Sequence, residues 1–196
     1  LVSTLGRLQS VPAVSEVVVV VAASEVEQQA VELGPVHVTA GGATRAASVV
    51  NGLNYIRDQL HHDGPVLVHD AARPCVRVED INQLIAKVGN NEHGGILAIA
   101  LHDTLKRADD EQCIADTVDR NCMWRAVTPQ LFRADKLLHA LKQAHAQGLE
   151  VTDEASAMEL AGYRPRLVAG AQDNIKITVA DDLLLARLII KSQEQS

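Results

Sequence analysis

The chain has 196 residues, which fits one domain (1–196), and its composition of 47% hydrophobic and 22% charged residues is ordinary for a globular protein. The formal net charge of −7 and an aromatic content of 2% argue against a nucleic-acid-binding protein, which usually needs a basic patch or stacking rings. No apolar run approaches the roughly 18 residues of a membrane span. The three cysteines lack metal-ligand spacing, as do the eight histidines, so we expect no metal site made by protein ligands alone and reduced thiols in a cytoplasmic protein.

The first hundred residues alternate between helical and strand patterns. Apolar residues at helical spacing predict helices over 1–11, 24–33, 44–60 and 79–88. Short apolar runs predict buried strands over 16–22, 36–39, 66–70 and 96–101. The connections are long enough for parallel crossovers. This alternation predicts an α/β fold with a doubly wound, mostly parallel sheet.

From residue 103 onward the pattern changes to that of a β-hairpin. Residues 103–107 and 114–120 alternate like half-exposed strands on either side of an acidic turn. Such a hairpin has too little apolar surface to be stable alone, so we expect it to lean on another subunit. Further along the chain, helices are predicted over 134–147, 153–161 and 180–191, and strands over 166–170 and 174–178.

The most informative stretch is 66–74, which reads Val-Leu-Val-His-Asp-Ala-Ala-Arg-Pro. Its apolar start predicts a buried strand, so Asp70 and Arg73 fall at the carboxyl end of that strand, where open α/β sheets bind ligands. A carboxylate and a guanidinium there suit a ligand that bears hydroxyls, phosphate or a metal, and the small Ala71 leaves room beside the backbone. A strand that ends in a salt-bridged turn is the alternative, and the stretch alone leaves both open.

Two further stretches carry candidate binding residues. Gly41 and Gly42 stand between a strand and a helix that carries Ser48, a pattern typical of a ligand-binding helix N-terminus but also of a plain tight turn. Lys176 lies within an apolar run and shares a strand face with Asn174, so it is either solvated at an edge or directed into a site.

Single threonines and an arginine on the hairpin are weaker candidates. Thr104, Thr128 and Thr152 each border an element, where hydroxyl caps are common, and Arg120 ends the hairpin, where cations are usually solvated. Taken alone, none of these four residues indicates a site.

Five motifs in order are more specific than any of them alone. They are Val-His-Asp-Ala-Ala-Arg-Pro at 68–74, Thr-Val-Asp-Arg-Asn at 117–121, Thr-Pro-Gln at 128–130, Thr-Asp-Glu-Ala-Ser at 152–156 and Asn-Ile-Lys-Ile-Thr at 174–178. This set closely resembles the 2-C-methyl-D-erythritol 4-phosphate cytidylyltransferases of the non-mevalonate isoprenoid pathway. The resemblance covers essentially the whole chain. It implies a Rossmann-like fold with a protruding β-arm, here 103–120, that embraces a second subunit of a homodimer.

The same resemblance implies an activity and roles for particular residues. The family transfers CMP from CTP to the substrate phosphate and releases pyrophosphate, with Mg²⁺ on the triphosphate. By position, the CTP-binding residues are Gly41, Gly42, Ser48, Asp70 and Ala71. The residues expected to hold the methylerythritol phosphate are Arg73, Thr128, Thr152 and Lys176, with Thr104 and Arg120 from the partner's arm. Arg120 and Lys176 are expected to position the attacking phosphate.

The family pattern begins with a glycine-rich loop bearing a lysine and an arginine, so we expect a first strand and this loop upstream of Leu1. Ala43 departs from relatives that carry an aspartate beside the base. Three alternatives stay open: another acceptor such as ribitol 5-phosphate, a nucleotide-binding module without catalysis, and a nicotinamide-binding domain. Against the last, no Gly-x-Gly-x-x-Gly follows any predicted strand.

Overall fold

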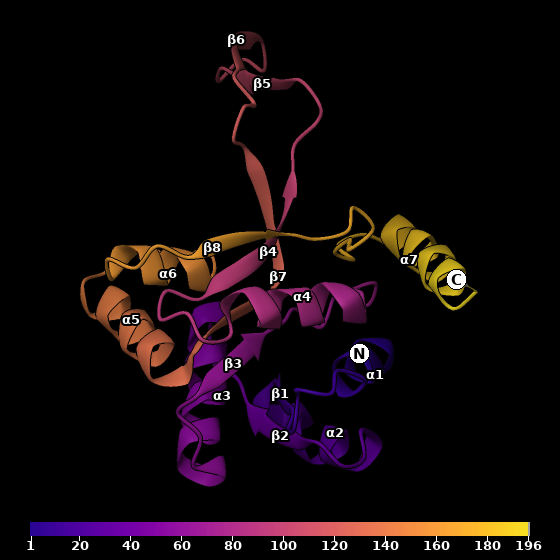
Figure 1. Cartoon of the computed structure of the whole chain (residues 1–196), viewed down its shortest axis with the longest axis vertical. Helices are drawn as coiled ribbons and strands as arrows, with labels where there is room; N and C mark the ends of the chain where they lie inside the picture. Colours follow the sequence, from indigo (N-terminus) through magenta and orange to yellow (C-terminus); the bar gives the residue numbers. More distant parts are fainter. Residues whose placement is uncertain (196) are drawn as a thin grey trace.

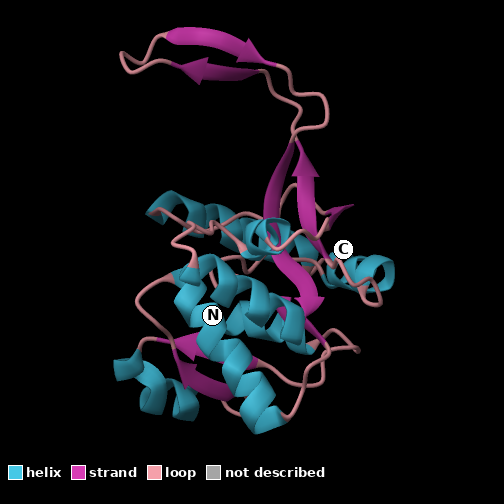
Figure 2. Ribbon diagram, turned by 90° about the vertical axis from the view of Figure 1, so that its left-hand side faces the viewer, coloured by secondary structure: helices cyan, strands magenta, loops and turns pink. Residues whose placement is uncertain are grey.

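The computed structural model describes residues 1–195 and shows an α/β body from which a long two-stranded arm projects (Figures 1 and 2). The helices are α1 (Val2–Gln9), α2 (Val26–Glu32), α3 (Arg45–Leu60), α4 (Val78–Val88), α5 (Ala134–Ala146), α6 (Glu154–Leu160) and α7 (Ala180–Gln193), with a 3-10 turn at Ala23–Glu25. The strands are β1 (Val18–Val21), β2 (His37–Ala40), β3 (Pro65–Val68), β4 (Gly95–Ala100), β5 (Leu105–Ala108), β6 (Ile114–Val118), β7 (Trp124–Arg133) and β8 (Arg166–Ala169).

The main sheet has four strands in the order β3-β7-β4-β8, and β1 pairs with β2 in a separate parallel ladder. β8 is parallel to β4, whereas β7 is antiparallel to both β3 and β4, so β3, β4 and β8 run the same way. β7 runs the opposite way because it returns directly from the arm that β4 enters. The prediction of an α/β fold with a mostly parallel sheet is confirmed, with β7 as the antiparallel member.

Both faces of this sheet are buried. Along β4, Ile96 and Ala98 belong to one apolar cluster, whereas Leu97 and Ile99 belong to the other. Residues from α3, α5 and α6 complete the first cluster, and residues from α4 complete the second. A strand covered on both faces has an unbroken apolar sequence, as 95–100 does.

The prediction of a strand at 174–178 is wrong, because this segment crosses the sheet end instead of pairing along an edge. One of its backbone hydrogen bonds runs from Ile177 N to the carbonyl of Ala72 in the turn after β3, at 2.8 Å. The side-chain amide of Asn174, which is fully buried, donates to the carbonyl of Thr128 on β7 at 2.8 Å. The segment thereby holds Lys176 over the carboxyl end of β3.

The arm consists of the far ends of β4 and β7, followed by the β5–β6 ribbon (Figure 1). Several large apolar side chains on it are exposed, including Ile114 at 68% and Trp124 at 38%. Buried contacts within one chain therefore do not account for these side chains.

A cavity of about 440 Å³ lies between β1 and β3. Each strand pairs on its other side, and no ladder joins β1 to β3 in the part of the chain that the structure describes. Apolar residues of both strands, α1 and α3 line most of the cavity, and its polar end contains Arg45, Asp70 and Lys176. Within residues 1–195 no helix combines the length and apolar character needed to cross a bilayer.

Candidate active site

The polar end of this cavity lies where β3 ends, as the position of Asp70 in the sequence predicts. Three cationic side chains from different parts of the chain surround the Asp70 carboxylate. Arg45 comes from the first turn of α3, Arg73 from the turn after β3, and Lys176 from the segment that crosses the sheet end. The fold thus brings together three of the predicted site residues, Asp70, Arg73 and Lys176.

Each oxygen of Asp70 has its own partners. Oδ1 accepts hydrogen bonds from Arg45 Nε at 3.2 Å and Nη2 at 3.1 Å, whereas Oδ2 lies 3.0 Å from Lys176 Nζ and 3.7 Å from Arg73 Nε. Burial raises the pKa of Asp70, but the Lys176 hydrogen bond and the Arg45 charge outweigh it and hold the pKa below its usual range. Asp70 is therefore ionised at neutral pH.

Arg73 has a donor that the protein leaves unused. Its Nη1 donates to the carbonyl of Asn174 at 2.9 Å, while its buried Nε has no hydrogen-bond partner among the described residues. The side chain is only 13% exposed, and burial lowers the pKa of this guanidinium. A buried charged donor without a hydrogen bond is costly, so an anionic ligand oxygen at this position would be stabilising.

A histidine and a threonine beneath Asp70 fix the turn. The backbone N–H of Asp70 donates to Thr128 Oγ1 at 3.1 Å, and Thr128 Oγ1 lies 3.0 Å from His69 Nδ1. His69 Nε2 lies 3.1 Å from the carbonyl of Arg73, which can only accept, so Nε2 carries the proton and Nδ1 accepts from Thr128. Burial lowers the pKa of His69 to about 4, which keeps the ring neutral. Thr128 is 4% exposed, and its hydroxyl supports the turn in this structure.

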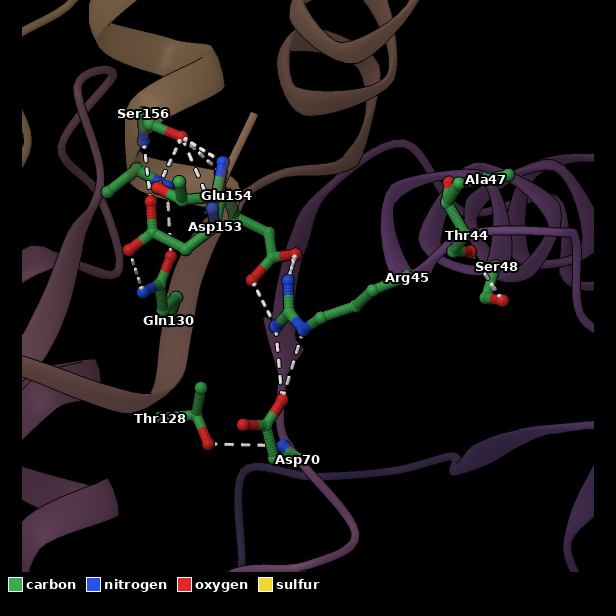
Figure 3. Close-up of polar contacts among 12 residues, drawn as sticks. Thr44, Arg45, Ala47, Ser48, Asp70, Thr128, Gln130, Asp153, Glu154 and Ser156 are labelled. Atoms are coloured by element: carbon green, nitrogen blue, oxygen red, sulfur yellow. Dashed lines mark hydrogen bonds and ion pairs between the residues drawn. The ribbon is translucent and has the colours of Figure 1, made fainter. Parts of the chain in front are cut away.

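The Gly41–Gly42 turn packs tightly against the first turns of α3. A Cβ on Gly41 would lie 2.7 Å from Ser48 Oγ, and one on Gly42 would lie 2.5 Å from the Cβ of Ala47. The N–H of Gly42 donates to Ser48 Oγ at 3.0 Å, and Thr44 caps the helix through the N–H of Ala47 (Figure 3). Close packing therefore explains both glycines, and Ser48 reaches the cavity that holds Asp70.

Comparison with known proteins identifies the family. The family profile described as IspD, 2-C-methyl-D-erythritol 4-phosphate cytidylyltransferase, matches residues 1–192. The chain belongs to this family. It is 47% identical over 188 residues to a protein of that name from Haemophilus influenzae strain PittEE, covering 95% of this chain and 81% of the relative. The corresponding protein of Vibrio vulnificus strain CMCP6 is 46% identical over 194 residues, covering 97% and 82%.

Solved structures agree with this assignment. A crystal structure of a 4-diphosphocytidyl-2C-methyl-D-erythritol synthase superposes with a TM-score of 0.86 at 40% identity, covering 96% of this chain and 88% of the other. The cytidylyltransferase of Thermus thermophilus gives a TM-score of 0.77 at 27% identity, covering 95% and 86%. The recognition and the Rossmann-like fold class predicted from the motifs are confirmed.

Three other residues predicted to bind the acceptor phosphate lie outside the cluster around Asp70. Thr152 is exposed just before α6, and its N–H donates to Ser156 Oγ at 3.2 Å. Thr104 and Arg120 flank the β5–β6 ribbon, and Arg120 contacts the carbonyl of His102. Figures 1 and 2 show this ribbon well away from β3, so one chain does not bring Thr104 or Arg120 to the site.

Two residues that sequence reasoning did not assign to the site are central to it. The carboxylate of Glu154, 1% exposed, binds both terminal nitrogens of Arg45, at 2.6 and 2.9 Å (Figure 3). Burial lowers the pKa of Arg45, but the hydrogen bonds and charges of Glu154 and Asp70 outweigh it, so the net pKa is raised. The Gly-Gly motif provides a weak signal for Arg45, whereas nothing local connects Glu154 to a residue 109 positions away.

No group of three or more metal-ligating side chains occurs among residues 1–195. Asp70 is the carboxylate that faces the cavity, because Glu154 is buried behind Arg45. Mg²⁺ usually keeps several waters and binds through one or two carboxylates together with substrate phosphates. The residues present therefore fit a magnesium ion carried by a nucleotide.

Proposed function

We propose that the protein transfers CMP from CTP to 2-C-methyl-D-erythritol 4-phosphate and releases pyrophosphate. The observation that carries this proposal is the cluster of Arg45, Arg73 and Lys176 around Asp70, at the ligand-binding edge of the sheet in a chain of this family. Such a site suits a reaction between two polyanions.

The chemistry needs positioning and fixed positive charge. An oxygen of the acceptor phosphate attacks the α-phosphorus of CTP, the bond from that phosphorus to the bridging oxygen breaks, and pyrophosphate leaves. No covalent enzyme intermediate is required, so catalysis comes from orientation and electrostatic stabilisation. Lys176 and the free Nε of Arg73 are the groups we assign to the acceptor phosphate, with Thr152 at the outer edge.

The nucleotide is assigned to the other side of Asp70. The cavity joins Ser48 to Asp70 and Ala71, so the base would lie by the Gly41–Gly42 turn and the ribose by Ala71. The carbonyl of Ala71 accepts from Thr4 Oγ1 at 2.8 Å, which fixes the backbone at this point. Magnesium, where bound, would supply charge neutralisation on the triphosphate, and Asp70 is the residue that would hold it.

A homodimer is part of this proposal. The exposed Ile114 and Trp124 on the projecting arm are the apolar groups expected of a partner contact. A partner's arm would bring Thr104 and Arg120 to the acceptor phosphate, which the chain's own arm does not. The three free cysteines support a cytoplasmic protein.

Pyrophosphate release with two acceptors tests the activity. CTP with Mg²⁺ is offered together with 2-C-methyl-D-erythritol 4-phosphate or ribitol 5-phosphate, and a reaction without acceptor serves as blank. We expect pyrophosphate release from CTP only when 2-C-methyl-D-erythritol 4-phosphate is the acceptor. Release with ribitol 5-phosphate instead would identify that compound as the acceptor. CTP binding without any pyrophosphate release would favour a non-catalytic nucleotide-binding module.

A further inference from the structure

Glu154 is a buried carboxylate that touches no part of the cavity itself. It lies in the first turn of α6, is 1% exposed, and its charge is matched by Arg45 from α3. A buried carboxylate is costly unless it is paired and hydrogen-bonded. A pair that only joined α3 to α6 would need no further partner, so the second residue that Arg45 binds is informative.

That second residue is Asp70. Arg45 directs Nη1 and Nη2 to Glu154 and, from its other edge, Nε and Nη2 to Oδ1 of Asp70 (Figure 3). Because a guanidinium is planar and rigid, two bonds to Glu154 fix its plane, and two bonds to one oxygen then fix the carboxylate of Asp70. Oδ1 is fully used, so Oδ2 is the oxygen turned toward Lys176.

We propose that Glu154 and Arg45 are positioning residues that fix the orientation of the Asp70 carboxylate, the group that the proposed function assigns to the nucleotide and its metal. This inference rests on the proposed function, because it assigns Asp70 to the CTP side of the reaction. Partners behind a ligating group typically change ligand affinity or activity by 10-fold to 100-fold when they are removed. The effect here should fall on CTP and Mg²⁺, with little effect on the acceptor phosphate.

The test uses Glu154→Gln, which keeps the size and one acceptor oxygen but removes the charge, and Arg45→Lys, which keeps the charge but removes the fork. For both we expect kcat/KM for CTP to fall by 10-fold to 100-fold and the Mg²⁺ concentration for half-maximal rate to rise. The KM for the acceptor should change less than about twofold. Calorimetric titration of CTP, with and without Mg²⁺, should show the same weakening without turnover.

A matched ion pair provides the control. Arg77 binds Asp173 through Nη2 at 2.6 Å and Nε at 3.2 Å, and neither residue lines the cavity. Arg77→Lys should leave all these constants unchanged. If Glu154→Gln does not fold, Arg45→Lys carries the test, because Arg45 is 38% exposed and lysine keeps the positive charge beside Glu154.

A double-mutant cycle with Asp70→Asn decides between positioning and general stabilisation. If Glu154 acts through Asp70, Glu154→Gln should have almost no further effect on kcat/KM for CTP once Asp70 is changed. Full additive loss in that background, or a lower Tm with unchanged kinetic constants, would overturn the proposal. An unmodified protein that releases no pyrophosphate, or an Asp70→Asn variant with full activity, would instead refute the proposed function or the role of Asp70.

Discussion

Replacing Lys176 with alanine should separate catalysis from stability. The side chain is 44% exposed and pairs with Asp70 at 3.0 Å, so its loss should lower the free energy of unfolding by at most about 1 kcal/mol, as for exposed ion pairs. One oriented group at a transition state is worth about 2.7–4 kcal/mol, so turnover should fall by about 10²–10³. The catalytic effect should therefore greatly exceed the structural effect.

Steady-state pyrophosphate release and a thermal melt measure the two effects on the same preparation. Lys176→Arg, which keeps the charge, should recover part of the turnover. Lys136→Ala serves as control, because Lys136 pairs with Glu92 at a similar 3.1 Å on another part of the surface. Near-normal kcat/KM for the acceptor in Lys176→Ala would remove Lys176 from the site.

The variant should also change the pH profile. The Lys176 hydrogen bond helps to lower the pKa of Asp70, so its removal raises that pKa. A group with a raised pKa loses its charge at higher pH, and the acidic limb of the rate profile should move upward. An unshifted acidic limb would indicate that the ionisation of Asp70 does not control the rate.

The remaining predictions concern the dimer and the buried histidine. Mixing inactive Arg120→Ala chains with inactive Lys176→Ala chains should restore about a quarter of wild-type activity, since half of the dimers are mixed and each carries one intact shared site; no recovery would mean that Arg120 serves its own chain. His69 has a pKa of about 4 in place of 6.5, so the unfolded chain binds the extra proton between these values and stability falls as the pH is lowered through that window. The free energy of unfolding, measured in urea, should fall by at most about 3 kcal/mol by pH 4. His69→Gln should abolish that part of the pH dependence. An equal slope of unfolding free energy against pH in the variant would assign the effect to other groups.

Much of the fold follows from local sequence patterns. The run at 95–100 is apolar throughout because both of its faces are covered, so its strand is readable from sequence. The segment at 174–178 alternates between polar and apolar residues, as a half-exposed strand does, but it lies across the sheet end, with Asn174 buried against Thr128. It bonds the turn after β3 and the carbonyl of Thr128 on β7 instead of joining a ladder, and no local signal distinguishes such a segment from a strand.

The candidate site, like the fold, is only partly predictable from local sequence. Asp70 and Arg73 are readable because they directly follow a buried strand, and Lys176 because a lysine is unusual in an apolar run. The pair of Arg45 and Glu154 depends on how α3 and α6 meet, across 109 residues of chain. Thr104 and Arg120 lie on an arm that points away from their own body, so the chain's own fold does not account for any role they have in the site.

The charges of the cluster limit what it can bind unaided. Arg45, Arg73 and Lys176 face the carboxylates of Asp70 and Glu154, which leaves a surplus of one positive charge. A single phosphate monoester carries about −1.5 to −2 at neutral pH, which already exceeds this surplus. A triphosphate and a monoester together would therefore meet net repulsion unless further cations join them. The cations that could offset this charge are magnesium on the nucleotide, the lysine and arginine of the loop expected upstream of Leu1, and Arg120 from a partner's arm. We therefore expect the cluster of Arg45, Arg73 and Lys176 to need at least one of these sources to hold both substrates together.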